Sequence, residues 1–320
     1  MGTAAPHVVE DCLGLIRLYS DGSIWRQKPE VVSSLFPEIA DDTVVFEDCT
    51  YDPHHGLSFR LYRPKSASLG RPLPLILYIH GGGFCLGSPR SNFSHNPCLR
   101  LTSGLEVVVV SLDYRLTPEH RLPAAIEDTL GAVEWIRGQA GSGDGRWSGV
   151  DFERVFVAGD SAGGNLAHHL AVRLGLGSAA AAPMRTRGFV LMSPFFGGVA
   201  RTQSEERPSD PVLNLEGADR LWRLSLPQGE NRDHPFANPF GPSSPSLEHM
   251  ALDPILVIAG GKEIMRDRIR DYAQKLRDVG KTVEYSEFEG QHHSFFTSDP
   301  YSEVGFEVIQ VIRRFMSKCD

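Results

Sequence analysis

Two glycine-rich motifs contain the residues best suited to chemistry. His80–Gly83 is a histidine followed by three glycines, and Gly159–Gly164 reads Gly-Asp-Ser-Ala-Gly-Gly. The first motif offers backbone N–H groups that no side chain obstructs, as an oxyanion hole requires. The second presents Ser161 in the G-x-S-x-G pattern of a nucleophile on a sharp turn. Together they supply two parts that ester hydrolysis needs, a nucleophile and a site for the oxyanion.

The surrounding sequence supports this interpretation of both motifs. A G-x-S-x-G pattern alone is weak evidence, because it arises readily by chance in a chain with 32 glycines, whereas the histidine–triple-glycine run is much rarer. The apolar runs 73–79 and 154–158 lead into the two motifs, and such runs ending in glycine turns are typical of buried parallel strands. Residues 162–174 then follow a helical pattern. A nucleophile elbow requires this strand–turn–helix context.

An acid and a base are expected downstream of Ser161, in the chain order acid and then histidine. Glu263 and Asp267 follow one apolar run, and the adjacent His292 and His293 follow the next. The carboxyl ends of parallel strands meet at one edge of a sheet, so these side chains are expected on the same edge as the serine. The residue types and spacing alone leave two candidates for the acid and two for the base.

Strand-like runs alternate with helical patterns along most of the chain. This alternation predicts an α/β fold with a mostly parallel sheet covered by helices on both faces. The expected strands are 57–63, 75–80, 106–112, 154–158, 188–192, 254–259 and 282–288, and the expected helices are 123–138, 163–174, 265–279 and 302–318. Residues 44–49 and 57–63 are joined by the turn sequence Asp-Pro-His-His-Gly, which favours an antiparallel hairpin at the sheet edge. We treat residues 1–320 as a single domain.

Two segments fit the sheet pattern poorly, namely residues 1–40 and residues 195–250. The first contains a short amphipathic stretch and then an irregular piece with prolines, and the second contains a helix-like run over 215–226 between turn-rich sequences. We expect both to form a cap over the site, and the alternative is that they are passive loops. Residues 138–149 and 176–183 are expected to be surface loops.

Composition and charge exclude several function classes. The chain has 320 residues, 41% of them hydrophobic and 22% charged, which is ordinary for a globular protein with a sizeable core. A net charge of −8 and the absence of any lysine- or arginine-rich run argue against a nucleic-acid partner. No run of eighteen apolar residues occurs, so no association with a membrane is expected.

Cysteine usage and the histidine pattern give no support for a metal site or a cofactor. The five cysteines are scattered without a C-x-x-C pair, and the histidines form no zinc-binding array. Neither a dinucleotide-binding nor a P-loop glycine pattern is present. Reduced thiols and an N-terminus without a secretory pattern favour a cytoplasmic, or also nuclear, location. The expected partner is a small-molecule ester or lactone, and the sequence leaves the oligomeric state open.

Several longer motifs together resemble one family. The chain is similar to the hormone-sensitive-lipase group of α/β-hydrolases, in particular to the plant carboxylesterases related to the gibberellin receptors. The matching motifs run from about residue 44 to the end of the chain, and a stretch over residues 9–22 resembles the N-terminal segment of plant members. The matching motifs are His80–Phe84, Asp113–His120, Leu122–Ala125, Gly159–Asn165, Asn238–Pro242 and Arg266–Arg268.

The resemblance implies a role for each part of the two glycine motifs. Ser161 would be the nucleophile. The N–H groups of Gly82, Gly83 and Ala162 would form the oxyanion hole, with Gly81 supporting the loop. His80 would fix that loop by hydrogen bonding and would not act as a base. Asp160, next to the nucleophile, is expected to bind within the turn and to take no catalytic part.

The resemblance also decides between the candidate acids and bases. Family members have Asp three residues before the Arg-Asp pair, and this chain departs from them by placing Glu263 there. A glutamate can orient a histidine equally well, so Glu263 is the expected acid, while Asp267 is expected to pair with an arginine. His293 is the expected base because it stands in the histidine–small–phenylalanine pattern of the family, and His292 is expected to have no catalytic duty.

Two functions are compatible with this family. The first is a serine carboxylesterase that cleaves esters or lactones of small apolar molecules, for which the resemblance implies plant secondary metabolites, xenobiotics or hormone esters such as strigolactones. The alternative is a non-catalytic hormone receptor of the gibberellin-receptor type. Such receptors have lost the catalytic histidine and have a longer N-terminal lid. His293 and the short N-terminal segment therefore favour the esterase.

Overall fold

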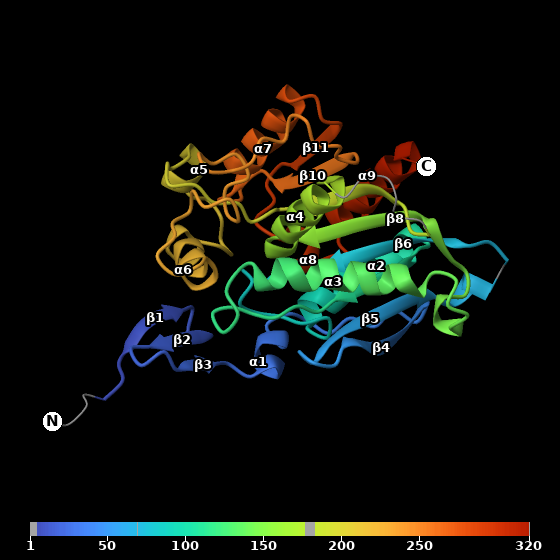
Figure 1. The fold of residues 1–320 in the computed structure, drawn as a ribbon, viewed down its shortest axis with the longest axis horizontal. Coiled ribbons are helices and arrows are strands. Elements are labelled where there is room, and N and C mark those ends of the chain that lie inside the picture. The colour runs from blue at the N-terminus through green and yellow to red at the C-terminus, as the bar shows by residue number, and fades with distance from the viewer. Residues whose placement is uncertain (1–4, 69, 177–182, 320) are drawn as a thin grey trace.

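A large twisted sheet forms the centre of the molecule (Figure 1). The computed structural model describes residues 5–68, 70–176 and 183–319. Eight strands lie in the order β11-β10-β9-β8-β6-β7-β5-β4. Strands β11 to β7 in that order are parallel, and β5 and β4 are antiparallel additions. The bounds are β4 Val44–Asp52, β5 Leu57–Pro64, β6 Leu73–Ile79, β7 Val108–Leu112, β8 Val150–Asp160, β9 Thr186–Met192, β10 Ile255–Gly260 and β11 Val283–Phe288.

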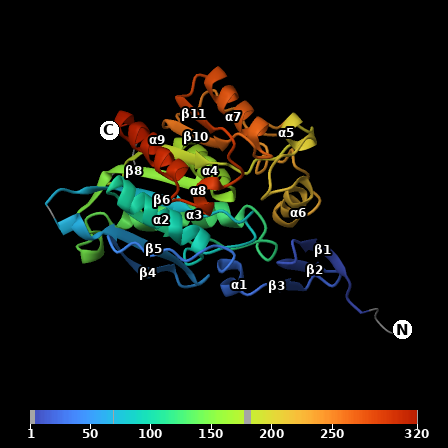
Figure 2. The ribbon, with the colours of Figure 1, turned by 180° about the vertical axis from the view of Figure 1, so that it is seen from behind.

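Helices cover both faces of this sheet, as Figure 1 and the view from behind in Figure 2 show. Alternate residues of the central strands point to opposite faces, so each face has its own core. One core packs against α3 (Ala124–Gln139), α4 (Ala162–Leu176) and α7 (Arg266–Asp278), and the other packs against α2 (Asn92–Leu105), α8 (Phe295–Ser298) and α9 (Glu303–Cys319). Every residue of β6 is buried, which explains its uninterrupted apolar sequence.

The α/β class, the parallel sheet and the edge hairpin that the sequence predicts are confirmed. Strand β8 is longer than expected, and β7 begins at Val108 because Glu106 closes the preceding helix in a left-handed conformation. Helix α2 is absent from the expectations, since Pro97 interrupts its pattern. Part of the expected loop over 138–149 forms a short 3-10 helix, Gly145–Trp147, and another covers Lys65–Ser68. The expected loop 176–183 falls mainly on residues outside those described.

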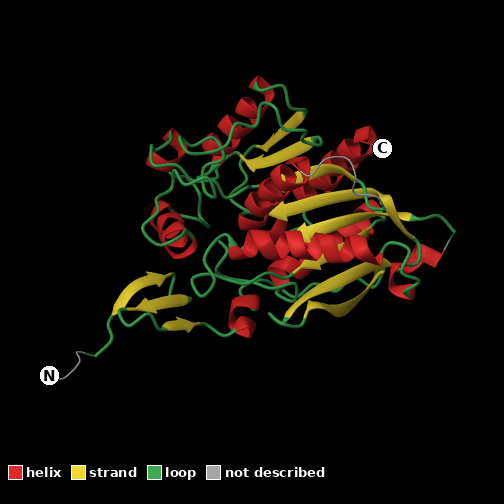
Figure 3. Ribbon diagram, in the orientation of Figure 1, coloured by secondary structure: helices red, strands yellow, loops and turns green. Residues whose placement is uncertain are grey.

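The two segments that fit the pattern poorly do not join the large sheet. Residues 8–26 form a separate three-stranded antiparallel sheet of β1 (Val8–Cys12), β2 (Ile16–Tyr19) and β3 (Ile24–Arg26), followed by α1 (Pro29–Ser33). Residues 195–250, hereafter the insertion, contain α5 (Gln203–Glu206) and α6 (Leu215–Ser225). Figure 3 shows the small sheet beside α6. In the part of the chain that the structure describes, no helix is both long and apolar enough to span a membrane.

Candidate active site

Ser161 occupies a strained turn between β8 and α4. Its φ of 52° lies in the left-handed region, which non-glycine residues seldom adopt. The flanking glycines permit the turn, because a Cβ on Gly159 would lie 2.2 Å from the carbonyl oxygen of Gly163. A Cβ on Gly163 would lie 1.9 Å from the carbonyl oxygen of Ile79, at the end of β6. The G-x-S-x-G pattern therefore packs the serine turn directly against the start of the other glycine motif.

Gly82 and Gly83 lie in the loop after β6, which packs beside the Ser161 turn. Gly82 and Gly83 have φ values of 97° and 59°, so both use the conformational freedom of glycine. Within the described residues, neither N–H donates a hydrogen bond. Ala162 is the first residue of α4, and its N–H has no acceptor within the helix. A Cβ on Gly81 would lie 3.3 Å from the Cβ of Ser161, so the loop lies against the serine.

The side chains of His80 and Tyr114 hold the backbone of this loop by hydrogen bonds. The Nδ1 of His80 lies 2.8 Å from the carbonyl oxygen of Gly81, and the Tyr114 hydroxyl donates to the carbonyl of His80 at 2.9 Å. The two rings stack with centroids 4.3 Å apart. Burial lowers the pKa of His80 to about 4, so the imidazole is neutral at physiological pH. This environment suits a structural histidine.

The structure brings Ser161, His293 and Glu263 into one continuous hydrogen-bonded chain. The Nε2 of His293 lies 2.9 Å from the Ser161 Oγ, and its Nδ1 lies 3.0 Å from the Glu263 Oε2. The other carboxylate oxygen of Glu263 accepts the N–H of Gly260 at 2.6 Å. All three side chains are buried, with relative exposures of 7% for Ser161, 5% for His293 and 1% for Glu263. The arrangement can transfer the serine proton to an imidazole held by a carboxylate.

The charges around His293 favour its protonated form. Burial of the imidazole opposes protonation, but the hydrogen bond and charge of Glu263, together with the charges of Asp160 and Asp210, outweigh burial and raise the pKa of His293. Burial raises the pKa of the Glu263 carboxyl, while His293 opposes that rise. Burial also raises the pKa of Asp160 to about 6. The imidazole thus lies among carboxyl groups that stabilise the cation formed when it accepts a proton.

The competing candidates lie outside this chain of hydrogen bonds. Asp267 accepts from the neighbouring Arg266 guanidinium at 3.0 Å and from the backbone N–H of Ser204 at 2.7 Å. The Nδ1 of His292 lies 2.8 Å from the carbonyl oxygen of His293 and reaches neither the serine nor Glu263. Asp160 accepts the hydroxyl of Ser294 at 2.8 Å. The arginine contact of Asp267 agrees with its expected role, whereas Asp160 binds Ser294, 134 positions away, and not its own turn as expected.

Comparison with known proteins agrees with the fold and the motifs. A family model described as "alpha/beta hydrolase fold" matches residues 76–297. The chain belongs to the α/β-hydrolase family. Within it, the chain falls in the group of plant carboxylesterases and gibberellin receptors. It is 35% identical to "Probable carboxylesterase 8" of Arabidopsis thaliana, over 84% of this chain and 82% of the relative.

Two further relatives of this α/β-hydrolase show the breadth of the group. "Gibberellin receptor GID1C" of Arabidopsis thaliana is 34% identical, over 82% of this chain and 78% of the receptor. The solved structure of an esterase from Pyrobaculum calidifontis matches with a TM-score of 0.72 and 31% identity, covering 90% of this chain and 88% of that chain. The same scaffold therefore occurs both in proteins named as esterases and in a protein named as a receptor.

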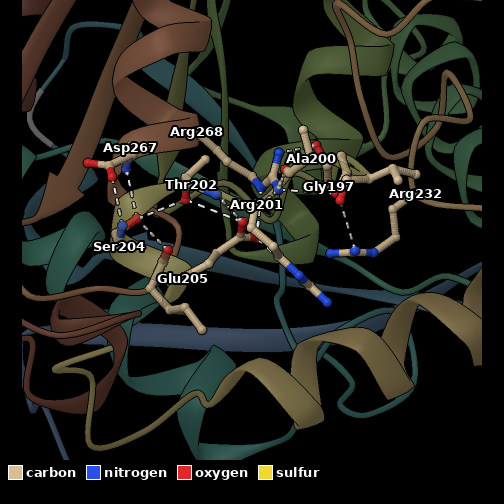
Figure 4. A network of polar contacts seen from close by, with 12 residues as sticks. Gly197, Ala200, Arg201, Thr202, Ser204, Glu205, Arg232, Asp267 and Arg268 are labelled. Carbon is tan, nitrogen blue, oxygen red and sulfur yellow. Dashed lines mark hydrogen bonds and ion pairs between the residues drawn. The ribbon is translucent and has the colours of Figure 1, made fainter. Parts of the chain in front are cut away.

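In this hydrolase the insertion contacts the loop that carries Glu263 and the start of α7. Figure 4 shows Ser204 and Glu205 of the insertion beside Asp267 and Arg268 of α7. The hydroxyl of Ser204 donates to the carbonyl of Ile264 at 2.8 Å, and Asp267 accepts the Ser204 N–H from the other side. Glu205, only 2% exposed, accepts two hydrogen bonds from Arg268 at 2.8 and 2.7 Å. Arg268 in turn donates to the carbonyls of Gly197, Gly198 and Ala200.

The N-terminal sheet contacts the loop after β6 through Arg26. The Arg26 guanidinium donates to the carbonyl of Cys85 and, at 2.8 Å, to that of Thr117. From the insertion, Ser225 of α6 donates to the carbonyl of Gly83 at 3.3 Å. The sequence predictions missed these supporting residues. They could not be predicted, because each lies 59 or more positions from its partner in the chain and stands in no local sequence pattern.

Proposed function

We propose that this protein is a serine carboxylesterase that acts through an acyl-enzyme. The observation that carries the proposal is the buried chain from the Ser161 Oγ through the His293 imidazole to Glu263, at 2.9 and 3.0 Å. We further propose that residues 1–320 form one domain, with residues 1–40 and the insertion as its cap. The contacts of Arg26 and Ser225 with the oxyanion loop support a cap that closes over the site.

In the first half-reaction, the Ser161 oxygen attacks the ester carbonyl while His293 accepts the hydroxyl proton. The negative charge that develops on the carbonyl oxygen is stabilised by the N–H groups of Gly82, Gly83 and Ala162, each contributing about 3 kcal/mol. When the tetrahedral intermediate collapses, His293 returns the proton to the leaving alkoxide, and the alcohol departs. The acyl group remains as an ester of Ser161.

In the second half-reaction, water replaces the alcohol. His293 takes a proton from water as it attacks the acyl-enzyme carbonyl, and the same oxyanion hole receives the charge. Collapse of the second intermediate returns the proton to Ser161 and releases the carboxylic acid. Throughout, Glu263 remains an anion that orients the imidazole and stabilises its protonated form.

The proposed substrates are carboxylic esters or lactones of small apolar molecules, such as plant secondary metabolites, xenobiotics or hormone esters including strigolactones. An apolar side chain of the insertion supports this class. Leu221 of α6 lies against Gly83, since a Cβ on that glycine would be 2.6 Å from a Leu221 methyl carbon. Substrate bound at the N–H of Gly83 would therefore meet an aliphatic side chain.

A receptor function is the second candidate, because gibberellin receptors are among the relatives. Binding alone does not require an imidazole that contacts a serine on one side and a buried carboxylate on the other. Burying Glu263 at 1% exposure carries a desolvation cost, which is offset here by the hydrogen bonds from His293 and Gly260. That arrangement favours hydrolysis over binding alone.

The test is hydrolysis of p-nitrophenyl acetate by the wild type and by Ser161→Ala. We expect measurable turnover that falls on the order of 10³-fold or more in the variant, since the nucleophile is lost. Ser246→Ala, at an exposed serine of the insertion, is the matched control and should keep wild-type turnover. A fluorophosphonate should add covalently to the wild type and not to Ser161→Ala. Undiminished turnover in Ser161→Ala would refute the proposal.

A further inference from the structure

Asp210, a residue of the insertion, contacts both the acid loop and the proposed base. One carboxylate oxygen, Oδ2, accepts the backbone N–H of His293 at 3.1 Å and the backbone N–H of Ile264 at 3.2 Å. Ile264 directly follows Glu263. A single oxygen atom thus links the residue after the acid to the base, although the two lie 29 positions apart in the chain.

The second oxygen of Asp210 holds the insertion itself. Oδ1 accepts the N–H groups of Val212 at 2.9 Å and Leu213 at 3.3 Å, which is a local turn that fixes the carboxylate in place. The four hydrogen bonds together use both oxygens of an ionised carboxylate, which can accept about four. The side chain is therefore saturated by contacts within the protein and is oriented from both ends.

The backbone on both sides of Glu263 is held by the insertion. Before Glu263, the hydroxyl of Ser209 donates to the carbonyl of Lys262 at 3.2 Å. After it, Asp210 accepts from the N–H of Ile264, while Ser204 donates to the carbonyl of the same residue. Both peptide groups that flank Glu263 consequently have a partner in the insertion. Among these contacts, the one made by Asp210 extends to His293.

We propose that Asp210 is a positioning residue that holds Glu263 and His293 within hydrogen-bonding distance of each other, so that the insertion takes part in assembling the catalytic site. The proposal rests on the proposed hydrolytic function of these residues. The Glu263 loop and His293 both donate to the Oδ2 of Asp210. This shared acceptor keeps the distance between them fixed when the end of β10 or β11 moves. If Asp210 were absent, Ser204 and Ser209 would still hold the Glu263 loop, but neither of them contacts His293. Small displacements at a reacting centre cost about 10²-fold in rate.

The charge of Asp210 gives the proposal a second signature. Three carboxyl groups act on the imidazole of His293, namely those of Glu263, Asp160 and Asp210, and each raises its pKa. His293 must be neutral to accept the serine proton, so activity is lost as the pH falls through its pKa. Removing the charge at position 210 lowers that pKa, and the acidic limb of the activity profile moves to lower pH.

The experiment compares Asp210→Ala and Asp210→Asn with the wild type. We expect kcat for p-nitrophenyl acetate to fall about 10- to 100-fold in Asp210→Ala, with little change in KM. Asp210→Asn should recover part of kcat when its carboxamide oxygen takes the place of Oδ2 and accepts the N–H groups of Ile264 and His293, at the cost of the turn contacts with Val212 and Leu213. Its acidic limb should still move to lower pH, because the charge is gone.

Asp233 provides the matched control. It lies in the same insertion and its carboxylate accepts the N–H of Val199 and the side-chain amide of Asn238, both at 3.0 Å, without touching either catalytic loop. Asp233→Ala should keep kcat and the pH profile. An equal loss of kcat in Asp233→Ala and Asp210→Ala would reduce Asp210 to a general stabiliser of the insertion. Wild-type kcat and an unmoved acidic limb in the Asp210 variants would also overturn the proposal.

A readout that does not depend on hydrolysis separates this proposal from the proposed function. The Nδ1–H proton of His293, shared with Glu263, should give a downfield NMR resonance that is absent in His293→Ala. We expect that resonance to be lost or displaced in Asp210→Ala and retained in Asp233→Ala. If the wild type hydrolyses no ester, the carboxylesterase assignment fails, and an unchanged resonance in Asp210→Ala overturns the positioning role. If Asp210→Ala does not fold, the pKa of His293 in Asp210→Asn decides, and an unaltered value contradicts the proposal.

Discussion

At the scale of single residues, the glutamate at the acid position is the main departure from the family pattern. Glu263 has one methylene more than the aspartate of the family pattern. One of its oxygens contacts His293, and the other accepts the N–H of Gly260 at 2.6 Å. Ser193 adds a weaker contact at 3.4 Å. The loop after β10 is therefore fitted to the longer side chain.

Variants at position 263 distinguish the effect of the negative charge on kcat from the effect of the side-chain length. We expect Glu263→Gln to lower kcat by about 10³- to 10⁴-fold, because the amide cannot stabilise the imidazolium. Loss of the charge that raises the pKa of His293 should also move the acidic limb to lower pH. Glu263→Asp should lose about 10- to 100-fold, since the carboxylate stops short of His293. The measurement is kcat as a function of pH.

Asp267→Asn is the comparison for both variants. Its carboxylate contacts Arg266 and Ser204 and does not reach His293. We expect a much smaller change in kcat than in Glu263→Gln. A larger loss in Asp267→Asn would instead make Asp267 the acid.

At the scale of elements, the small N-terminal sheet contacts the loop after β6, which holds the proposed oxyanion hole, through the side chain of Arg26. Arg26, at the end of β3, donates to the carbonyls of Cys85 and Thr117 and pairs with Glu119. Glu10 of β1 binds Arg223 of α6 at 2.7 Å, so the same sheet also contacts the insertion. The sheet thus connects the loop after β6 to the insertion.

Arg26→Ala should weaken catalysis by loosening this connection. A charged donor to a partly buried carbonyl stabilises the fold by about 1.5–3 kcal/mol. Its loss should let the loop after β6 shift, and because small displacements at a reacting centre cost up to about 10²-fold in rate, we expect kcat/KM to fall about tenfold or more. Arg17→Ala is the control, because Arg17 lies in the same sheet and its half-exposed side chain contacts Asp11 and the Trp25 ring, both within that sheet. Steady-state kinetics and the rate of proteolysis before residue 40 measure the effect. Equal behaviour of the two variants would show that the sheet does not support the site.

Some strands and helices could be predicted from the sequence, and others could not. Strands ending in glycine motifs could be predicted because their apolar runs and turns are local features, and the edge hairpin could be predicted from its turn. Helix α2 could not, since Pro97 breaks its pattern while tertiary packing keeps the helix intact. Apart from the buried Cys12 and Ile16, the residues of the paired strands β1 to β3 are exposed or half-buried and show no clean alternation.

The candidate site divides in the same way. Ser161, the glycines and His293 stand in recognisable local patterns, so the sequence indicates them. The partners of Asp210 lie 54 and 83 positions away, and nothing near Asp210 marks it as different from other aspartates. Its contacts exist only because the insertion folds back over the ends of β10 and β11.

At the scale of the whole molecule, the buried Asp160 makes stability depend on pH. Burial raises its pKa to about 6, from 3.8 in an exposed chain, so the folded state holds this proton more firmly than the unfolded state. The contribution of Asp160 is unfavourable once the group ionises. Stability is therefore lost as the pH rises from about 4 to about 6.

Asp160→Asn should remove this dependence. Relative to the wild type, we expect the variant to gain free energy of unfolding as the pH rises through that window, by up to about 3 kcal/mol for a shift of two pH units. Urea unfolding at several pH values measures the difference. Asp278→Asn, on the exposed side of α7, controls for the substitution itself. A constant difference between Asp160→Asn and the wild type at all pH values would contradict the expectation.

The carboxylate of Asp210 bears on whether the insertion is an exchangeable module. Residues 195–250 lie between β9 and β10, so they could be replaced by another hydrolase's loop without cutting a strand. Such a chimera would import new pocket walls and at the same time discard Asp210, Ser209 and Ser204, which bracket Glu263. Specificity and catalytic competence are thus inherited together here. A recombinant that keeps residues 203–213 and exchanges only α6 and the turns after it would separate them.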